Sequence, residues 1–116
     1  MGKRAQRLRL LDIAAQISAI ETAVAGLTID DFRSDWLRRS AVERGIEVIS
    51  EATRHLAPDL TARHPDIPWR RIADIGNWLR HAYEQVDPAL IWFIVIDEFP
   101  ALKIAIAAML AETPED

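Results

Sequence analysis

The sequence predicts an all-α protein, an antiparallel bundle of four to five helices. Apolar residues recur at spacings of three and four in several segments, which is the periodicity of a helix that buries one face. No stretch of useful length alternates apolar and polar residues as a half-buried strand would. Prolines and capping residues divide the chain at intervals that suit connections between helices.

The first predicted helix carries an apolar seam and stops near Gly26, a residue that readily ends a helix. The seam consists of Leu10, Ile13, Ile17, Ile20, Val24 and Leu27. The stretch that follows, "TIDDFRSD", is rich in residues that favour caps and turns. We therefore expect a connection there rather than a continuous helix.

The second helix is predicted from about Asp35 to Leu56. Its apolar stripe consists of Val42, Ile46, Ile49, Thr53 and Leu56. Pro58, Pro65 and Pro68 then leave room for only a short helical turn.

Pro68 suits the first turn of a third helix, where its missing N–H would be unpaired anyway. This helix is predicted to run to about Glu84. Asp87 and Pro88 form another start signal, a capping carboxylate followed by proline, so the last helix begins there. Pro100 is predicted to kink or split that helix.

Length and composition predict a single domain over residues 1–116, because 116 residues suit one domain and half of them are hydrophobic. The net charge is −4, whereas proteins that coat themselves in nucleic acid are usually basic. Any contact with nucleic acid is therefore expected to be local. The absence of cysteine excludes disulfides and thiolate metal sites.

Neither end of the chain is read as a targeting or membrane segment. The N-terminus is basic and then apolar, but Arg9 and Asp12 interrupt any signal-peptide core. The most apolar stretch, "ALIWFIVIDEFPALKIAIAAML", carries Asp97, Glu98 and Lys103 near its middle and is a poor membrane span. We expect a cytoplasmic protein.

The segment "GNWLRHAYEQVD" gathers Asn77, Arg80, His81 and Tyr83 within two helical turns. A helical layout puts Asn77 and His81 one turn apart on the polar side, with Arg80 beside them and Tyr83 at the edge of the apolar side. These residues can be the solvated face of an amphipathic helix. Periodicity alone favours that interpretation. They can also be a phosphate-handling cluster, with a proton-transferring histidine, an orienting amide and a charge-stabilising arginine.

The chain resembles the HepT-type proteins with a HEPN domain, the toxin half of MNT–HepT toxin–antitoxin pairs. The resemblance covers "RSDWLRRSAVERGIEVISEATRHL", "HPDIPWRRIADIGNWLRHAYEQVD" and "IWFIVIDEFPALKIAI". The family motif reads Arg-Asn, three residues, His, any residue, Tyr. Asn77, His81 and Tyr83 match it, but Gly76 stands where the family has arginine. Arg80, just before His81, is the candidate to supply that charge.

This resemblance implies an all-helical homodimer with the motif lining a cleft at the interface. It implies a metal-independent endoribonuclease without a cofactor, acting as a toxin of the type VII class. It also implies a partner, a nucleotidyltransferase antitoxin of the MNT type, which silences the toxin by transferring AMP to the motif tyrosine. Tyr83 is the matching position for this AMPylation. An adduct there adds bulk and negative charge that repel RNA phosphate.

Two further residues are secondary candidates. Glu51 lies in the "ISEA" stretch of the resemblance and can face the cleft, and Arg70 shares the polar stripe of the third helix. Arg70 is about 16 Å from His81 along the helix, so it is expected to serve another part of the surface or a partner subunit. Glu43, Glu47 and Glu51 recur every four residues, a row that more often forms helical ion pairs than a metal site.

Three functions remain open at the level of sequence. The first is a HepT-like ribonuclease with His81 as general acid or base. The second is a non-catalytic HEPN module that binds nucleotide, RNA or the nucleotidyltransferase, which Gly76 in place of arginine favours. The third is a small helical scaffold that only dimerises.

Overall fold

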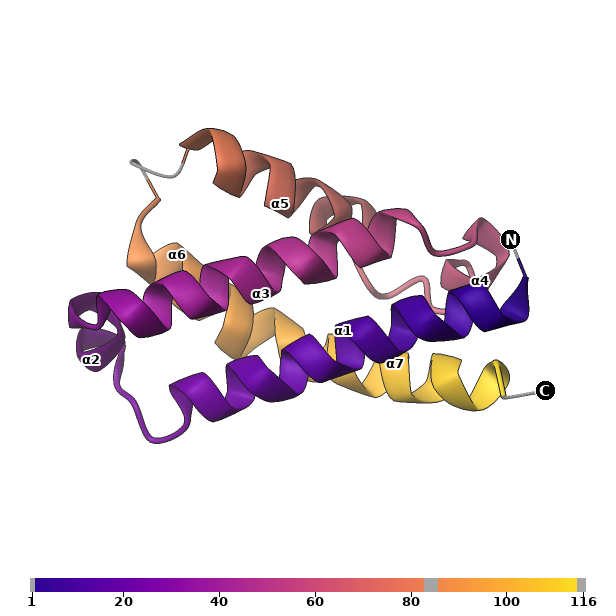
Figure 1. The fold of residues 1–116 in the computed structure, drawn as a ribbon, viewed down its shortest axis with the longest axis horizontal. Helices are drawn as coiled ribbons and strands as arrows, with labels where there is room; N and C mark the ends of the chain where they lie inside the picture. Colours follow the sequence, from indigo (N-terminus) through magenta and orange to yellow (C-terminus); the bar gives the residue numbers. More distant parts are fainter. Residues whose placement is uncertain (1, 83–85, 115–116) are drawn as a thin grey trace.

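The structure is a computed structural model that describes residues 2–82 and 86–114. The described residues form helices and no strand, which confirms the all-α prediction. The elements are α1 (Lys3–Val24), α2 (Ile29–Ser34), α3 (Trp36–Arg54), α4 (Pro58–Thr61), α5 (Trp69–Ala82), α6 (Pro88–Phe93), the π-helix η2 (Ile94–Glu98) and α7 (Phe99–Glu112). Figure 1 shows α1, α3, α5 and the α6–η2–α7 segment running alternately in opposite directions.

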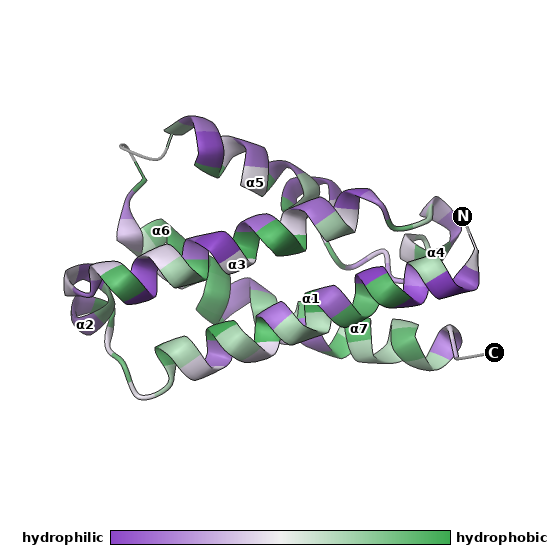
Figure 2. Ribbon diagram, viewed as in Figure 1, coloured by the Kyte–Doolittle hydropathy of each residue, from purple (hydrophilic) through white to green (hydrophobic). Residues whose placement is uncertain are grey.

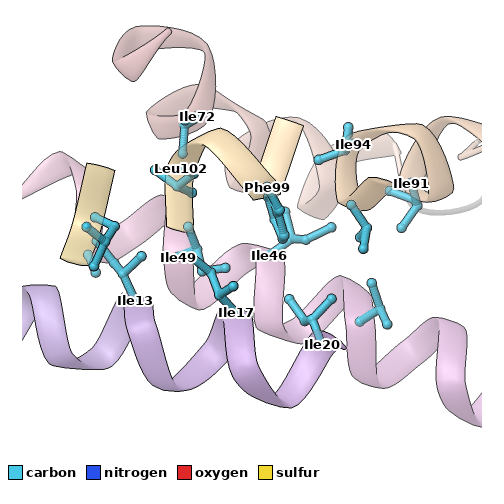
Figure 3. Close-up of a cluster of buried hydrophobic side chains, with 14 of the residues drawn as sticks. Ile13, Ile17, Ile20, Ile46, Ile49, Ile72, Ile91, Ile94, Phe99 and Leu102 are labelled. Atoms are coloured by element: carbon cyan, nitrogen blue, oxygen red, sulfur yellow. The ribbon is translucent and has the colours of Figure 1, made fainter. Parts of the chain in front are cut away.

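The core lies between α1, α3 and the α6–η2–α7 segment. Figure 3 shows Ile13 and Ile17 of α1 beside Ile49 of α3, with Leu102 of α7 above them. These side chains are at most 1 % exposed. Figure 2 shows apolar and polar residues alternating around α1, α3 and α5, as expected for helices with one buried face. The predicted seam of α1 is buried from Leu10 to Val24, and Gly26 ends the helix at a φ of 75°.

One short helix lies in the stretch for which the sequence predicted only caps and turns. Thr28 and Asp31 form a capping box at the start of α2, in which the Asp31 N–H donates to Thr28 Oγ1 and the Thr28 N–H donates to the Asp31 carboxylate. Phe32 is fully buried and its ring lies 5.4 Å from that of Trp92 in α6. The box and one buried anchor are therefore enough to make a helical turn here.

Helix α3 is the central helix of the bundle. Asp35 caps its start by accepting from the Arg38 N–H, and the observed bounds differ from the predicted ones by one residue at the start and two at the end. Its predicted apolar stripe is buried throughout. Gly45 lets α3 approach α1 closely, because a Cβ there would lie 2.9 Å from Ile20 Cδ1.

The proline-rich connection contains one helical turn, α4, as predicted. Helix α5 then begins at Trp69, directly after Pro68. The indole N–H of Trp69 donates to the carbonyls of Thr61 and His64, which ties the start of α5 to the connection. Helix α5 packs along α3, so the position of α5 depends on that contact.

The last predicted helix begins at Pro88 and is split before Pro100, both as predicted. Asp87 caps α6 by accepting from the Ala89 N–H. Pro100 lacks an N–H and its ring crowds the carbonyl four residues earlier, so an α-helical ladder cannot run through it undisturbed. The wider π-turn η2, Ile94–Glu98, precedes it, and α7 continues beyond.

Two residues in the first two turns of α1 hydrogen-bond to other parts of the chain. The Gln6 side chain donates to the His55 carbonyl and accepts from the Ala57 N–H, at 3.0 and 2.7 Å. Arg7 donates to the carbonyls of Leu110 and Thr113, at 3.2 and 2.8 Å. The chain ends lie at the same end of the bundle (Figure 1). None of the helices in the described ranges has the length and apolar character of a membrane span.

Candidate functional site

Helix α5 has an inner face against α3 and an outer face toward solvent. Ile72, Gly76 and Leu79 are buried on the inner face. Asn77, Arg80 and His81, the three residues that the sequence proposes as catalytic, are exposed on the outer face. The helix therefore displays an amide, a guanidinium and an imidazole within its last two turns.

The inner face is fixed by a close contact between Gly76 and Ser50 of α3. Ser50 is 1 % exposed. Its hydroxyl donates to the Ala73 carbonyl at 2.8 Å and accepts from the Gly76 N–H at 3.0 Å. A Cβ at position 76 would lie 2.8 Å from both Cβ and Oγ of Ser50. Glycine inside a helix is unfavourable relative to alanine, so its presence here is explained by the close approach of the two helices.

This contact bears directly on the missing arginine. The side chain of an arginine at position 76 would begin inside the buried contact between α3 and α5, where it would displace Ser50. Arg80 lies one turn later, exposed and next to His81. Arg80 is thus exposed without entering the close contact between Gly76 and Ser50.

Arg80 and Glu51 line the same hollow, of about 220 Å³, between α1, α3 and the end of α5. We call it the α1–α3–α5 hollow. Its charged lining residues are Arg9, Asp12, Arg44, Glu47, Glu51 and Arg80. The structure therefore brings together Arg80, which the sequence proposes as catalytic, and Glu51, a secondary candidate.

The carboxylates of α3 in this hollow have partners on their own helix. Glu51 lies 3.2 Å from His55 Nε2 and 3.8 Å from Arg54 Nε, and Glu47 lies 3.3 Å from an Arg44 nitrogen. Glu43 lies outside the hollow, and burial raises the pKa of its carboxyl, with Arg39 acting in the opposite direction. Within residues 2–82 and 86–114, no cluster of three or more potential metal ligands occurs.

Arg70 is not part of this group. It lies in the first turn of α5 and lines a separate hollow with Pro68 and Asp74. Tyr83, the proposed AMPylation site, falls outside the described residues.

Sequence reasoning missed a third hollow, of about 410 Å³, which is mostly apolar. Its lining comes from α3, α5, α6, η2 and the start of α7, and Trp78 and Leu90 stand at its exposed part. Arg71 and Glu98 form an ion pair on its lining. Since each helix contributes only a few residues, no single stretch of sequence signals this hollow.

The fold and the outer face of α5 define a class: a small helical bundle that carries an Asn–His pair one turn apart with an arginine beside it. The family described as ribonuclease HepT-like matches residues 13–109. The chain belongs to this family.

Three relatives illustrate the match. A protein of Thermococcus cleftensis named "Probable ribonuclease HepT" is 38 % identical over 101 residues, covering 87 % of this chain and 92 % of the relative. A candidate RNase of Methanocaldococcus jannaschii is 34 % identical, covering 86 % of this chain and 83 % of the relative. A candidate RNase of Caldanaerobacter subterraneus is 31 % identical, covering 75 % and 78 %. No solved structure matches the chain significantly.

Proposed function

We propose that this protein is an endoribonuclease, the toxin of a toxin–antitoxin pair of the MNT–HepT type. The observation that carries the proposal is the outer face of α5, where Asn77, Arg80 and His81 are exposed together on a chain of the ribonuclease HepT-like family. The names of the relatives as ribonucleases support the same substrate class.

The proposed reaction uses the 2′-hydroxyl of the RNA as nucleophile. His81, as general base, takes the proton of that hydroxyl while its oxygen attacks the adjacent phosphorus. The bond from phosphorus to the 5′-oxygen breaks, and a protonated histidine returns a proton to that leaving oxygen. Arg80 stabilises the charge that builds on the non-bridging oxygens, and Asn77 orients the imidazole or donates to one of those oxygens. No metal ion is required by this scheme.

The reaction needs both an acid and a base, so we propose a homodimer that brings two copies of His81 together. Exposed apolar residues at the hollow of about 410 Å³ support this proposal. Trp78 of α5 and Leu90 of α6, which line it, are 40 and 44 % exposed. Large exposed apolar residues that cluster on one side of a soluble protein mark interaction surfaces, and a twofold axis through such a face would use the same residues of both copies.

Neutralisation is proposed to occur at Tyr83. A partner nucleotidyltransferase of the MNT type transfers AMP from ATP to the tyrosine oxygen and releases pyrophosphate. The adduct adds negative charge three residues from Arg80, where it opposes RNA phosphate. On co-expression with the partner, we expect intact-mass measurement to show one added adenylyl group per chain. The same mass gain in Tyr83→Phe would refute this site.

A second candidate function is a non-catalytic HEPN module that binds RNA, nucleotide or the nucleotidyltransferase. The burial of Gly76 against Ser50 favours it, because the position where the family has arginine is part of the helix contact in this chain. Both functions use the outer face of α5, and they differ in whether a phosphodiester bond breaks.

Cleavage of a single-stranded RNA in the presence of EDTA tests the proposal. We expect the wild type to cleave and His81→Ala to be slower by about 10²- to 10⁴-fold, the usual contribution of general acid–base catalysis. His64→Ala is the matched control, since His64 pairs with Glu112 away from α5's outer face. The ribonuclease is refuted if the folded wild type leaves the RNA intact, and binding of RNA without cleavage would support the module. Equal cleavage by wild type and His81→Ala would remove His81 from the mechanism.

A further inference from the structure

We infer that the α1–α3–α5 hollow binds one nucleotide unit of single-stranded RNA next to the scissile phosphate, with Arg9 contacting the phosphate of that unit. The inference rests on the proposed function, because it takes RNA as the substrate. It adds a residue from α1 to a site that the sequence assigned to α5 and α3 alone.

Three helices each contribute one guanidinium to this hollow. Arg9 comes from α1, Arg44 from α3 and Arg80 from α5. Arg80 belongs to both the hollow and the outer face of α5, where it precedes His81. An RNA strand that places a phosphate at His81 and Arg80 therefore has its neighbouring nucleotide at the mouth of the hollow. Arginine is well suited to this role because its planar donors match phosphate oxygens.

The size of the hollow favours a single unit. Its volume of about 220 Å³ is below the range of pockets that enclose drug-sized ligands. A duplex is too wide for it, whereas single-stranded RNA presents unstacked nucleotides that separate pockets can take. The protein is acidic overall, so attraction of RNA has to come from individual cations placed at the site, such as Arg9 and Arg80.

The charged lining of the hollow is balanced, with three arginines and three carboxylates. The negative charge of Glu47 is paired with Arg44, and that of Glu51 with His55 and Arg54. Within residues 2–82 and 86–114, Arg9 and Arg80 take part in no ion pair.

Asp12, three residues after Arg9, also lines the hollow. A carboxylate repels phosphate but accepts hydrogen bonds from ribose hydroxyls and base amino groups. A hollow with arginines and an acceptor carboxylate therefore suits a phosphate, a sugar and a base together.

Binding of a short 2′-O-methylated single-stranded RNA tests this inference without cleavage, because the nucleophile is blocked. The variant is Arg9→Gln, and the control is Arg4→Gln, the same change on the same helix at a residue that does not line the hollow. We expect Arg9→Gln to weaken binding about tenfold. Its slope of log affinity against log salt should fall by about 0.7, as for one lost phosphate contact on a single strand. Arg9→Lys keeps the charge and should retain part of the affinity.

Each outcome of the binding experiment either supports or overturns RNA binding in the hollow. Weaker binding by Arg9→Gln with near-wild-type binding by Arg4→Gln supports the hollow. Equal losses in the two variants would mean that the N-terminal cations act only through long-range attraction, and unchanged binding by Arg9→Gln would overturn the inference outright. If RNA binds through Arg9 but is never cut, the ribonuclease proposal fails while the hollow stands. If wild type does not bind RNA, the hollow proposal fails too.

Discussion

The inner and outer faces of α5 belong to the same 14-residue helix but depend on different parts of the molecule. The inner face meets α3 so closely that position 76 has no room for a Cβ, and the buried hydroxyl of Ser50 in α3 hydrogen-bonds to the backbone of α5. The outer face displays Asn77, Arg80 and His81 to solvent. The positions of these side chains follow mainly from their spacing along the helix.

The two faces therefore place different constraints on neighbouring positions of the same motif. Neighbouring motif positions, 76 and 77, differ in burial, because one helical step of about 100° carries the side chain from the buried to the exposed side. Position 76 is therefore subject to the packing of α3 and α5, whereas position 77 faces solvent. Glycine at the first motif position is a packing feature in this chain.

The largest effect is expected from Gly76→Arg, which introduces the arginine of the family motif into the inner face. We expect this change to lower the free energy of unfolding by roughly 3 kcal/mol or more, because the side chain overpacks a close helix contact and brings a charge into it. Chemical denaturation measures the loss. Asn77→Ala, on the outer face, is the control and should change stability by less than about 0.5 kcal/mol. A fully stable Gly76→Arg protein with higher ribonuclease activity would show that position 76 belongs to the site.

A smaller effect is expected from Ser50→Ala, which weakens the contact between α3 and α5 without adding a larger side chain. It removes the hydrogen bonds to the Ala73 carbonyl and from the Gly76 N–H, so we expect a loss of about 1 to 2 kcal/mol in the free energy of unfolding. In Ser50→Gly, which removes both Cβ and Oγ, Gly76→Ala should be better tolerated than in the wild type, because neither atom then opposes the new methyl group. A double-mutant cycle of these two changes measures the coupling, and strictly additive effects would refute the contact as the reason for glycine.

Helices were predictable from the sequence where the residues of one segment are enough to determine them. The seam of α1 and the stripe of α3 are buried as their spacing predicts, and Asp87 with Pro88 begins α6. Helix α2 is not predicted because its capping residues also favour turns, whereas the burial of Phe32 against Trp92 of α6 depends on a distant part of the chain.

The candidate site was predictable only where it depends on one helix. The exposure of Asn77, Arg80 and His81 follows from their positions around α5. The burial of Gly76 depends on Ser50, 26 residues earlier, and the meeting of Arg80 with Arg9 and Glu51 depends on three helices packing together. Helical periodicity gives the direction of a side chain but does not name the helix that it meets.

The clamp of Arg7 on the carbonyls of Leu110 and Thr113 has a kinetic consequence. It joins residues 103 and 106 positions apart, which makes it one of the longest loops that the chain closes. Closing a loop over this separation costs chain entropy. We therefore expect the clamp to form late in folding, so that its loss in Arg7→Ala speeds unfolding more than it slows folding. Unfolding and refolding rates measured in denaturant check this, and an effect on the folding rate alone would contradict it. One arginine near the start of α1 is thus expected to act on how long the bundle stays folded, far along the chain from α5.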